Sequence, residues 1–376
     1  LKKTFASDEQ IVQFALGDVS RCFGEEYAQY RNRPVQRNPN RDFQLMSRVL
    51  EFEGNRHEFE KPMRIISEYD VPEDAWFFQQ NSHPEWMPYS VLMEIALQPC
   101  GFISANSGAM LIYPELDLHY RNLDGNGTLS KHIDLRRKTI QAEVELYSTV
   151  ASGNTVIQKH RFLLKFEGLP FYKGDTVFGY FTDEALENQT GLDGGKAKLP
   201  WLDENTNHDM KVYRLNDSNS GLESGKPHLK LAGNQLNLLD EVHLSPSVGS
   251  HGKGYAYGKR IVDPKDWFFP CHFHQDPVMP GSLGVEAILQ ALQVFCLDQK
   301  LGDSFSNPRF RPSLSQTRWK YRGQIIPTTG MMQLELDVSK IEKQDEQLML
   351  VADASLWRDQ LRIYEVQNIS LVIEEA

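Results

Sequence analysis

Two side chains suited to acid–base chemistry flank one short motif in the C-terminal part of the chain. His272 stands seven residues before Met279, which lies in the segment Asp276-Pro-Val-Met-Pro-Gly281, and Glu286 stands seven residues after it. An imidazole with a pKa near neutrality suits removal of a proton. A carboxyl group in an apolar setting can stay protonated and donate a proton. The spacing therefore indicates a candidate general base and a candidate general acid.

The candidate acid falls within a predicted helix, from about residue 282 to 298, that is apolar nearly all round. Such a helix is buried, and burial is costly for a carboxyl group without a function. Gly281 opens the helix, where free backbone N–H groups can stabilise a developing negative charge and a substrate can approach closely. We therefore take Gly281, its neighbour Ser282, and Cys271 as candidate residues for binding the substrate or an oxyanion.

The sequence contains an internal repeat. Three groups recur in the same order and at nearly equal separations: Trp76-Phe77-Phe78 as Trp267-Phe268-Phe269, Met87-Pro88 as Met279-Pro280, and Glu94 as Glu286. Such agreement indicates two copies of one domain. We predict domains over residues 1–185 and 231–376. The connecting residues 186–230 are rich in Asn, Asp, Gly, Ser and Lys, which is typical of a linker.

Each predicted helix is followed by segments in which polar and apolar residues alternate, such as residues 141–147 and 332–338. Alternation of this kind is typical of half-exposed antiparallel strands. In the first copy we expect Pro99 to kink or end the helix. One buried helix followed by long antiparallel strands predicts an α+β fold, with a sheet wrapped around the helix.

The stretch from Trp267 to Gln290 closely resembles the signature of the bacterial FabA-like 3-hydroxyacyl-acyl carrier protein dehydratases, and Trp319 to Gln324 resembles it more weakly. The two fused copies resemble the tandem dehydratase region of bacterial polyunsaturated fatty-acid synthases. The resemblance implies a double hotdog fold and dehydration of a 3-hydroxyacyl group to an enoyl group. The group would be carried on the phosphopantetheine of acyl carrier protein, with no metal or organic cofactor. The isomerising branch of the family commonly has Asp at the acid position, so Glu286 and Glu94 put double-bond isomerisation in doubt.

The first copy departs from this signature at two positions. Gln80, rather than His, stands seven residues before Met87, and Tyr89 occupies the position of Gly281, whereas Glu94 is retained. In the family, each site takes its His from one subunit and its acid from the other. The resemblance therefore implies one composite site of His272 and Gly281 with Glu94, and it leaves Glu286 facing a degenerate pocket. Glu286 as the acid partner of His272 remains the alternative.

Net charge and composition limit the classes of partner that the chain could bind. A formal charge of −11 argues against broad nucleic-acid binding. An acidic carrier protein would need a local basic patch, and Arg318, Lys320 and Arg322 stand on alternate residues of one predicted strand, although a solvated strand face is also common. No apolar run approaches the ~20 residues of a membrane-spanning helix. We expect other synthase domains as partners, and a homodimer of the tandem is an open alternative.

The cysteines and the start of the chain bear on its setting. Four widely spaced cysteines without zinc-ligand spacing favour reduced thiols in a cytoplasmic protein. The chain begins at Leu1 rather than Met, which we interpret as a segment of a longer polypeptide.

Several simpler readings compete with the composite site. His272 and His274 have strand spacing and could share a face as metal ligands, but no third ligand is evident. Cys271 could be a nucleophile or an ordinary buried thiol, and Glu94 could be a structural remnant. At the level of function, the alternatives are a hotdog thioesterase and a non-catalytic acyl-binding or assembly module of a megasynthase.

Overall fold

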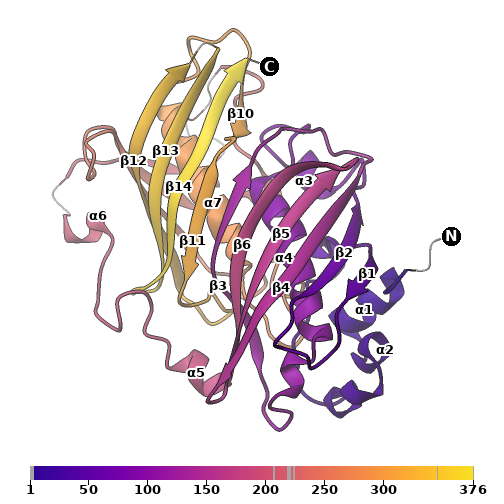
Figure 1. The fold of residues 1–376 in the computed structure, drawn as a ribbon. Helices are drawn as coiled ribbons and strands as arrows, with labels where there is room; N and C mark the ends of the chain where they lie inside the picture. The colour runs from indigo at the N-terminus through magenta and orange to yellow at the C-terminus, as the bar shows by residue number, and fades with distance from the viewer. Residues whose placement is uncertain (1–3, 206–207, 218–221, 223–224, 345, 376) are drawn as a thin grey trace.

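The computed structural model describes residues 4–205, 208–217, 222, 225–344 and 346–375. Its strands form one 14-stranded sheet that runs through the whole molecule (Figure 1). Two long helices, α4 (Tyr89–Asn106) and α7 (Gly281–Asp298), pack against this sheet and against each other. The predicted α+β class and the double hotdog architecture are confirmed.

The first half of the sheet lies against α4. Its strands are β1 (Arg48–Glu53), β2 (Met63–Asp70), β3 (His119–Leu129), β4 (Thr139–Ser152), β5 (Thr155–Phe166) and β6 (Leu169–Phe181). Three further helices belong to this half: α1 (Asp8–Leu16), α2 (Ser20–Phe23) and α3 (Trp76–Gln79). From the centre of the molecule outward, the strand order is β3-β6-β5-β4-β2-β1.

The second half of the sheet lies against α7. Its strands are β7 (Lys211–Arg214), β8 (Glu241–Ser245), β9 (Tyr255–Ile261), β10 (Pro308–Pro312), β11 (Gln316–Tyr321), β12 (Met331–Gln344), β13 (Gln347–Arg358) and β14 (Leu361–Glu375). From the centre outward, the order is β11-β14-β13-β12-β9-β8-β7, and β10 pairs with β14. The first six strands repeat the order of the first half, so the sequence repeat corresponds to a repeat of topology.

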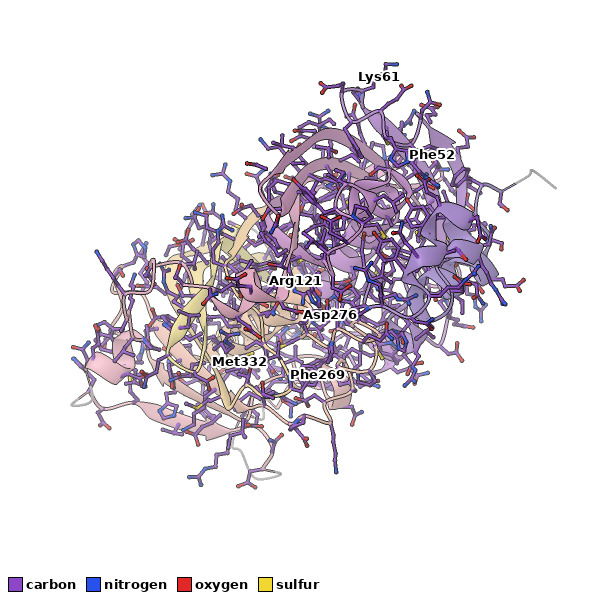
Figure 2. The ribbon with its side chains drawn as sticks, turned by 90° about the horizontal axis from the view of Figure 1, so that it is seen from below. Phe52, Lys61, Arg121, Phe269, Asp276 and Met332 are labelled. Carbon is purple, nitrogen blue, oxygen red and sulfur yellow. The ribbon has the colours of Figure 1, made fainter. Side chains whose placement is uncertain are left out.

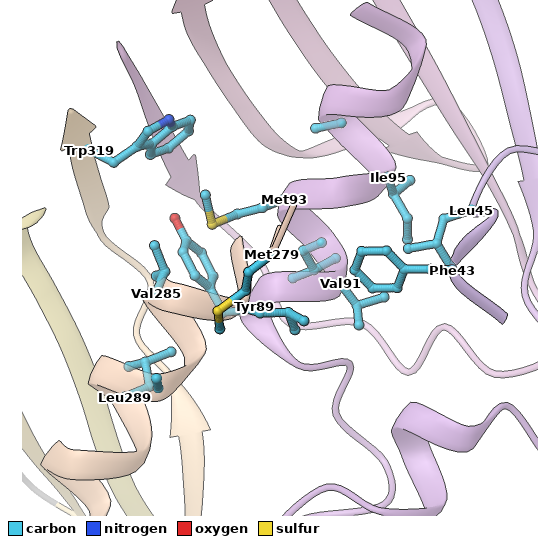
Figure 3. Close-up of a cluster of buried hydrophobic side chains, with 14 of the residues drawn as sticks. Phe43, Leu45, Tyr89, Val91, Met93, Ile95, Met279, Val285, Leu289 and Trp319 are labelled. Atoms are coloured by element: carbon cyan, nitrogen blue, oxygen red, sulfur yellow. The ribbon is translucent and has the colours of Figure 1, made fainter. Parts of the chain in front are cut away.

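The two halves join by a strand pair and by a shared core. Strands β3 and β11 pair antiparallel, with Lys320 opposite Asp124. The repeated tryptophans Trp76 and Trp267 meet with ring centroids 5.0 Å apart. Apolar side chains from the N-terminal parts of α4 and α7 belong to one buried cluster (Figure 3). Because the sheet and the core are continuous, the start of each helix lies close to the other half of the molecule.

We expected Pro99 to kink or end α4, and the helix does not end there but continues to Asn106. A proline inside a helix removes one hydrogen bond and costs ~3 kcal/mol. All residues of α4 except Leu97 are buried. The burial of these side chains between the sheet and α7 offsets the cost of the proline, which local sequence rules do not include.

The connecting segment 186–230 is fastened to the second half. It begins within α5 (Asp183–Glu187), and it contains α6 (Trp201–Glu204) and the edge strand β7, which pairs with β8. Asp193 accepts hydrogen bonds of 2.7 and 2.8 Å from Arg362. Residues 206–207, 218–221 and 223–224 of the predicted linker lie outside the described residues. Within the described part of the chain, no helix is long and apolar enough to cross a membrane.

Candidate active site

His272 lies in the loop that precedes α7, and its ring is buried. Its Nδ1 is 2.9 Å from the carbonyl oxygen of Val278. A carbonyl oxygen can only accept, so Nδ1 carries the proton and Nε2 is left as the free base in the neutral ring. Burial lowers the pKa of His272 to about 4, so the imidazole is neutral near pH 7.

Two charged residues of the first half fix the same loop. Arg121 on β3 makes two 2.6 Å hydrogen bonds to the carboxylate of Asp276, and His119 is 3.0 Å from it. Burial acts to raise the pKa of Asp276, but Arg121 and His119 outweigh it and hold this pKa well below its usual range. Figure 2 places Arg121 and Asp276 side by side where the two halves meet. The ion pair therefore fastens the loop of His272 to the other half of the molecule.

Glu94 lies in the second turn of α4 and is 5% exposed. One carboxyl oxygen accepts a 2.7 Å hydrogen bond from the hydroxyl of Ser282, and the other accepts a 3.3 Å hydrogen bond from the side-chain amide of Gln98. Burial raises the pKa of Glu94 despite these two donors. A carboxyl group in this environment can hold a proton near neutral pH and can act as an acid.

A cavity of about 100 Å³ brings the predicted residues of both copies together. His272, Gly281 and Ser282 line it from the second half, and Glu94 lines it from the first. Gly281 is the first residue of α7, and a Cβ added there would lie 2.6 Å from the ring of Tyr321. The first N–H groups of a helix lack an intrahelical acceptor. The cavity thus combines a neutral imidazole, a carboxyl group with a raised pKa and a helix N-terminus.

The structure places Glu286 away from this cavity wall. Its carboxyl accepts a 3.1 Å hydrogen bond from the backbone N–H of Ser90, at the start of α4. Tyr89, the counterpart of Gly281, is buried, and its hydroxyl is 3.3 Å from that of Tyr172. A carboxyl group and a tyrosine therefore occupy the N-terminus of α4, which is where the degenerate pocket was expected.

Cys271 was expected to bind the substrate or an oxyanion, but it is not among the described residues that line the cavity. The thiol is buried and lies 3.4 Å from the carbonyl oxygen of Trp267, and burial raises its pKa. Its own carbonyl oxygen accepts two 2.9 Å hydrogen bonds from Asn40 of the first half. The position favours a structural thiol that helps to hold the loop of His272.

The basic residues of β11 lie on the outside of the molecule. Arg318 and Lys320 are exposed, whereas Arg322 is paired with the carboxylate of Asp124 at 3.0 Å. The groove beside them also includes Asp175 and Glu365 as acidic lining. Docking of a carrier protein at this strand stays a prediction, and the neighbouring carboxylates weaken the local positive charge.

No group of three or more His, Cys, Asp or Glu side chains arranged to hold a metal occurs among the described residues. His274 is not among the residues that line the cavity with His272. Sequence reasoning missed Arg121, Gln98 and Tyr321 in the wall of the cavity. The internal repeat could have indicated Gln98, since it stands four residues after Glu94 just as Gln290 stands four residues after Glu286. No sequence pattern could have indicated Arg121, because its partner Asp276 is 155 residues away in the chain.

The comparisons with known proteins define the class. Residues 231–367 match the family model of the FabA-like domain, and this part of the chain belongs to that family. The fold and the match together define this half of the chain as a FabA-like hotdog domain. The resemblance predicted from its motifs is therefore confirmed.

One relative matches nearly the whole chain. Over 96% of its length the chain is 35% identical to a polyunsaturated fatty acid synthase subunit from Thraustochytrium sp. (strain ATCC 26185 / S-3). The chain spans 26% of that relative's length. The match includes the first copy, which the FabA-like model does not cover.

The solved structures that match most of the chain include two at low sequence identity. A dehydratase domain of a trans-AT polyketide synthase from Brevibacillus brevis is 12% identical, with a TM-score of 0.49 over 84% of this chain and 94% of that chain. A putative oleoyl thioesterase from Lactobacillus plantarum is 6% identical, with a TM-score of 0.45 over 83% of this chain and 96% of that chain.

Proposed function

We propose that this chain dehydrates 3-hydroxyacyl thioesters carried on acyl carrier protein, at one composite site formed by both copies. The observation that carries the proposal is the cavity in which His272 of the second copy and Glu94 of the first line the same space. Two shifts support these roles, because burial keeps the imidazole of His272 neutral near pH 7 and raises the pKa of Glu94, which favours its protonated form.

The proposed reaction uses His272 as the base and Glu94 as the acid. The Nε2 atom of His272 takes the proton from C2 of the substrate, and the electron pair of that bond moves toward the thioester carbonyl. The N–H groups at the start of α7 stabilise the negative charge on the carbonyl oxygen. Glu94 then protonates the hydroxyl group on C3 while the C3–O bond breaks. The products are one water molecule and an enoyl thioester with a double bond between C2 and C3.

The substrate class follows from the relatives and from the position of the cavity. The relative from Thraustochytrium carries the name of a polyunsaturated fatty acid synthase component. We therefore propose that acyl carrier protein and other domains of such a synthase are the partners. The cavity lies at the junction of the copies, so a phosphopantetheine arm would enter there with the acyl group at its end.

The proposal covers dehydration, and isomerisation of the product is a separate question for the same assay. Purified protein is incubated with a 3-hydroxyacyl thioester of acyl carrier protein, and the products are identified by mass spectrometry and NMR. An enoyl thioester with its double bond at C2–C3 supports the proposal, and a double bond at C3–C4 adds isomerase activity. A free acid would instead indicate a thioesterase. An unreacted substrate that stays bound would indicate a non-catalytic acyl-binding module.

A further inference from the structure

The hydroxyl group of Tyr321 is the feature of the cavity that the proposed chemistry does not use. Tyr321 ends β11, is 5% exposed and lines the cavity. Its hydroxyl group has no hydrogen-bond partner among the described residues. A buried polar group without a partner lowers stability, so an unpaired hydroxyl group on a residue that lines the cavity is a candidate donor to a substrate atom.

Other buried tyrosines of this protein do have partners. The hydroxyl groups of Tyr27, Tyr30 and Tyr180 donate to the oxygen atoms of Ala105, Met110 and Gln36, at 2.6, 2.7 and 2.6 Å. These three residues show that a buried tyrosine with only a structural role has a hydrogen-bond acceptor for its hydroxyl group in this chain. Tyr321 differs from them because the residue lines the cavity and its buried hydroxyl group has no acceptor among the described residues.

The ring of Tyr321 is held against the start of α7. A Cβ added to Gly281 would lie 2.6 Å from Cε2 of Tyr321 and 2.9 Å from Cζ, the atom that carries the hydroxyl group. On its other side, the ring packs against Tyr364 with centroids 4.3 Å apart. The phenol therefore sits beside the first residue of the helix whose N–H groups face the substrate.

We propose that the Tyr321 hydroxyl group donates a hydrogen bond to the thioester carbonyl oxygen, together with the N–H groups at the start of α7. This inference rests on the proposed dehydration. The carbonyl oxygen gains negative charge when the C2 proton leaves, and two donors at one oxygen stabilise that charge more than one does. Burial raises the pKa of Tyr321 well above its ordinary value, so the phenol keeps its proton and stays a donor.

The alternative place for this donor is the departing hydroxyl group, beside Glu94. Both oxygen atoms of Glu94 already accept hydrogen bonds, from Ser282 and Gln98. These two donors hold the carboxyl group of Glu94, which itself supplies the proton at the departing hydroxyl group, whereas at the carbonyl oxygen Gly281 offers backbone N–H groups only. This difference favours the carbonyl oxygen as the partner of Tyr321.

The test separates the two ends of the substrate. A saturated acyl thioester of acyl carrier protein, which has no hydroxyl group at C3, is incubated in heavy water, and exchange at C2 is followed by mass spectrometry. We expect Y321F to slow this exchange and the dehydration of a 3-hydroxyacyl thioester by a similar factor, about 10- to 100-fold. The matched control is Y172F in the degenerate half, which should leave both rates unchanged.

The outcomes are distinct. Slowed dehydration with unchanged exchange would assign Tyr321 to the departing hydroxyl group and overturn the inference, as would two unchanged rates. If the wild type neither dehydrates nor exchanges, the proposed function fails, whatever Y321F does. The melting temperature of Y321F should equal or exceed that of the wild type, because the variant removes an unpaired buried hydroxyl group.

A second variant covers the case in which Y321F does not fold. Replacement of Tyr321 by 3,5-difluorotyrosine keeps the shape of the ring and makes the phenol a stronger donor. Infrared spectroscopy of the bound saturated thioester should then show the carbonyl band at a lower frequency than in the wild type. An unchanged band in this variant would overturn the inference independently of any rate.

Discussion

The hydroxyl group of Ser282 donates a 2.7 Å hydrogen bond to Glu94, although 188 positions separate the two residues in the chain. The mirror contact joins Glu286 to Ser90, but there the donor is the backbone N–H, at 3.1 Å. Each acid thus reaches across to the start of the other copy's helix. At the start of α7, the carboxyl group of Glu94 contacts the side chain of Ser282. At the start of α4, the carboxyl group of Glu286 contacts the backbone of Ser90.

Glu94 and Glu286 should therefore differ in their importance for activity. We expect E94Q to reduce kcat by about 10²- to 10⁴-fold, as loss of a general acid does, and H272A to lose activity as well. E286Q, the matched control from the second copy, should retain activity because its side chain is not in the wall of the cavity. The measurement is the rate of dehydration of a 3-hydroxyacyl carrier-protein thioester, with folding checked by circular dichroism. An inactive E286Q beside an active E94Q would rule out the composite site.

The hydroxyl group of Ser282 should affect the pKa of Glu94. Its hydrogen bond lowers the pKa of Glu94 against the effect of burial, so S282A should raise that pKa further. We expect the alkaline limb of the kcat/KM profile to move to higher pH and kcat to fall about 10-fold, because a weaker acid donates its proton less readily. S90A is the control, since Ser90 contacts Glu286 through its backbone N–H. An alkaline limb that S282A leaves in place would show that Glu94 does not set it.

The pH dependence follows from the directions of the two shifts. Activity needs neutral His272, which protonates at about pH 4, and protonated Glu94, whose pKa is raised. The kcat/KM profile should be a bell with its acid limb near pH 4. Between pH 6.5, the ordinary pKa, and about 4, the unfolded state binds more protons at His272, so the folded state loses stability as the pH falls. In H272Q the unfolding free energy should depend less on pH across this window, and an unchanged slope would contradict the lowered pKa.

The ion pair between Arg121 and Asp276 should matter far more than a surface pair. Their side chains are 10% and 18% exposed, against 61% and 37% for Arg161 and Glu145. R121Q leaves a buried carboxylate without its main partner and should lower the unfolding free energy by about 3 kcal/mol. R161Q should change it by less than about 1 kcal/mol. Chemical denaturation measures both, and equal effects would show that the pair does not fasten the loop of His272.

Local pattern predicted the fold because both helices are apolar nearly all round and both are followed by alternating strands. The repeat then indicated which residues correspond, and the cavity contains His272, Gly281 and Glu94 as expected. The Arg121–Asp276 pair and the orphaned Tyr321 hydroxyl group depend on contacts between the copies, which no local rule contains. The continuation of α4 past Pro99 and the strand β7 within the predicted linker also depend on tertiary packing, which overrides helix and loop propensity.

The covalent connection between the copies has an evolutionary consequence. In a symmetric dimer of identical subunits, every substitution appears twice, so a tyrosine in place of the helix-opening glycine would block both sites at once. In this chain Tyr89 and Gly281 coexist because each copy mutates alone. If the proposed composite site is correct, duplication followed by fusion released one copy from selection for chemistry while its acid still served the other. The sheet pairing of β3 with β11 holds the two copies together, so on this proposal the first copy persists as a scaffold that supplies a single carboxyl group.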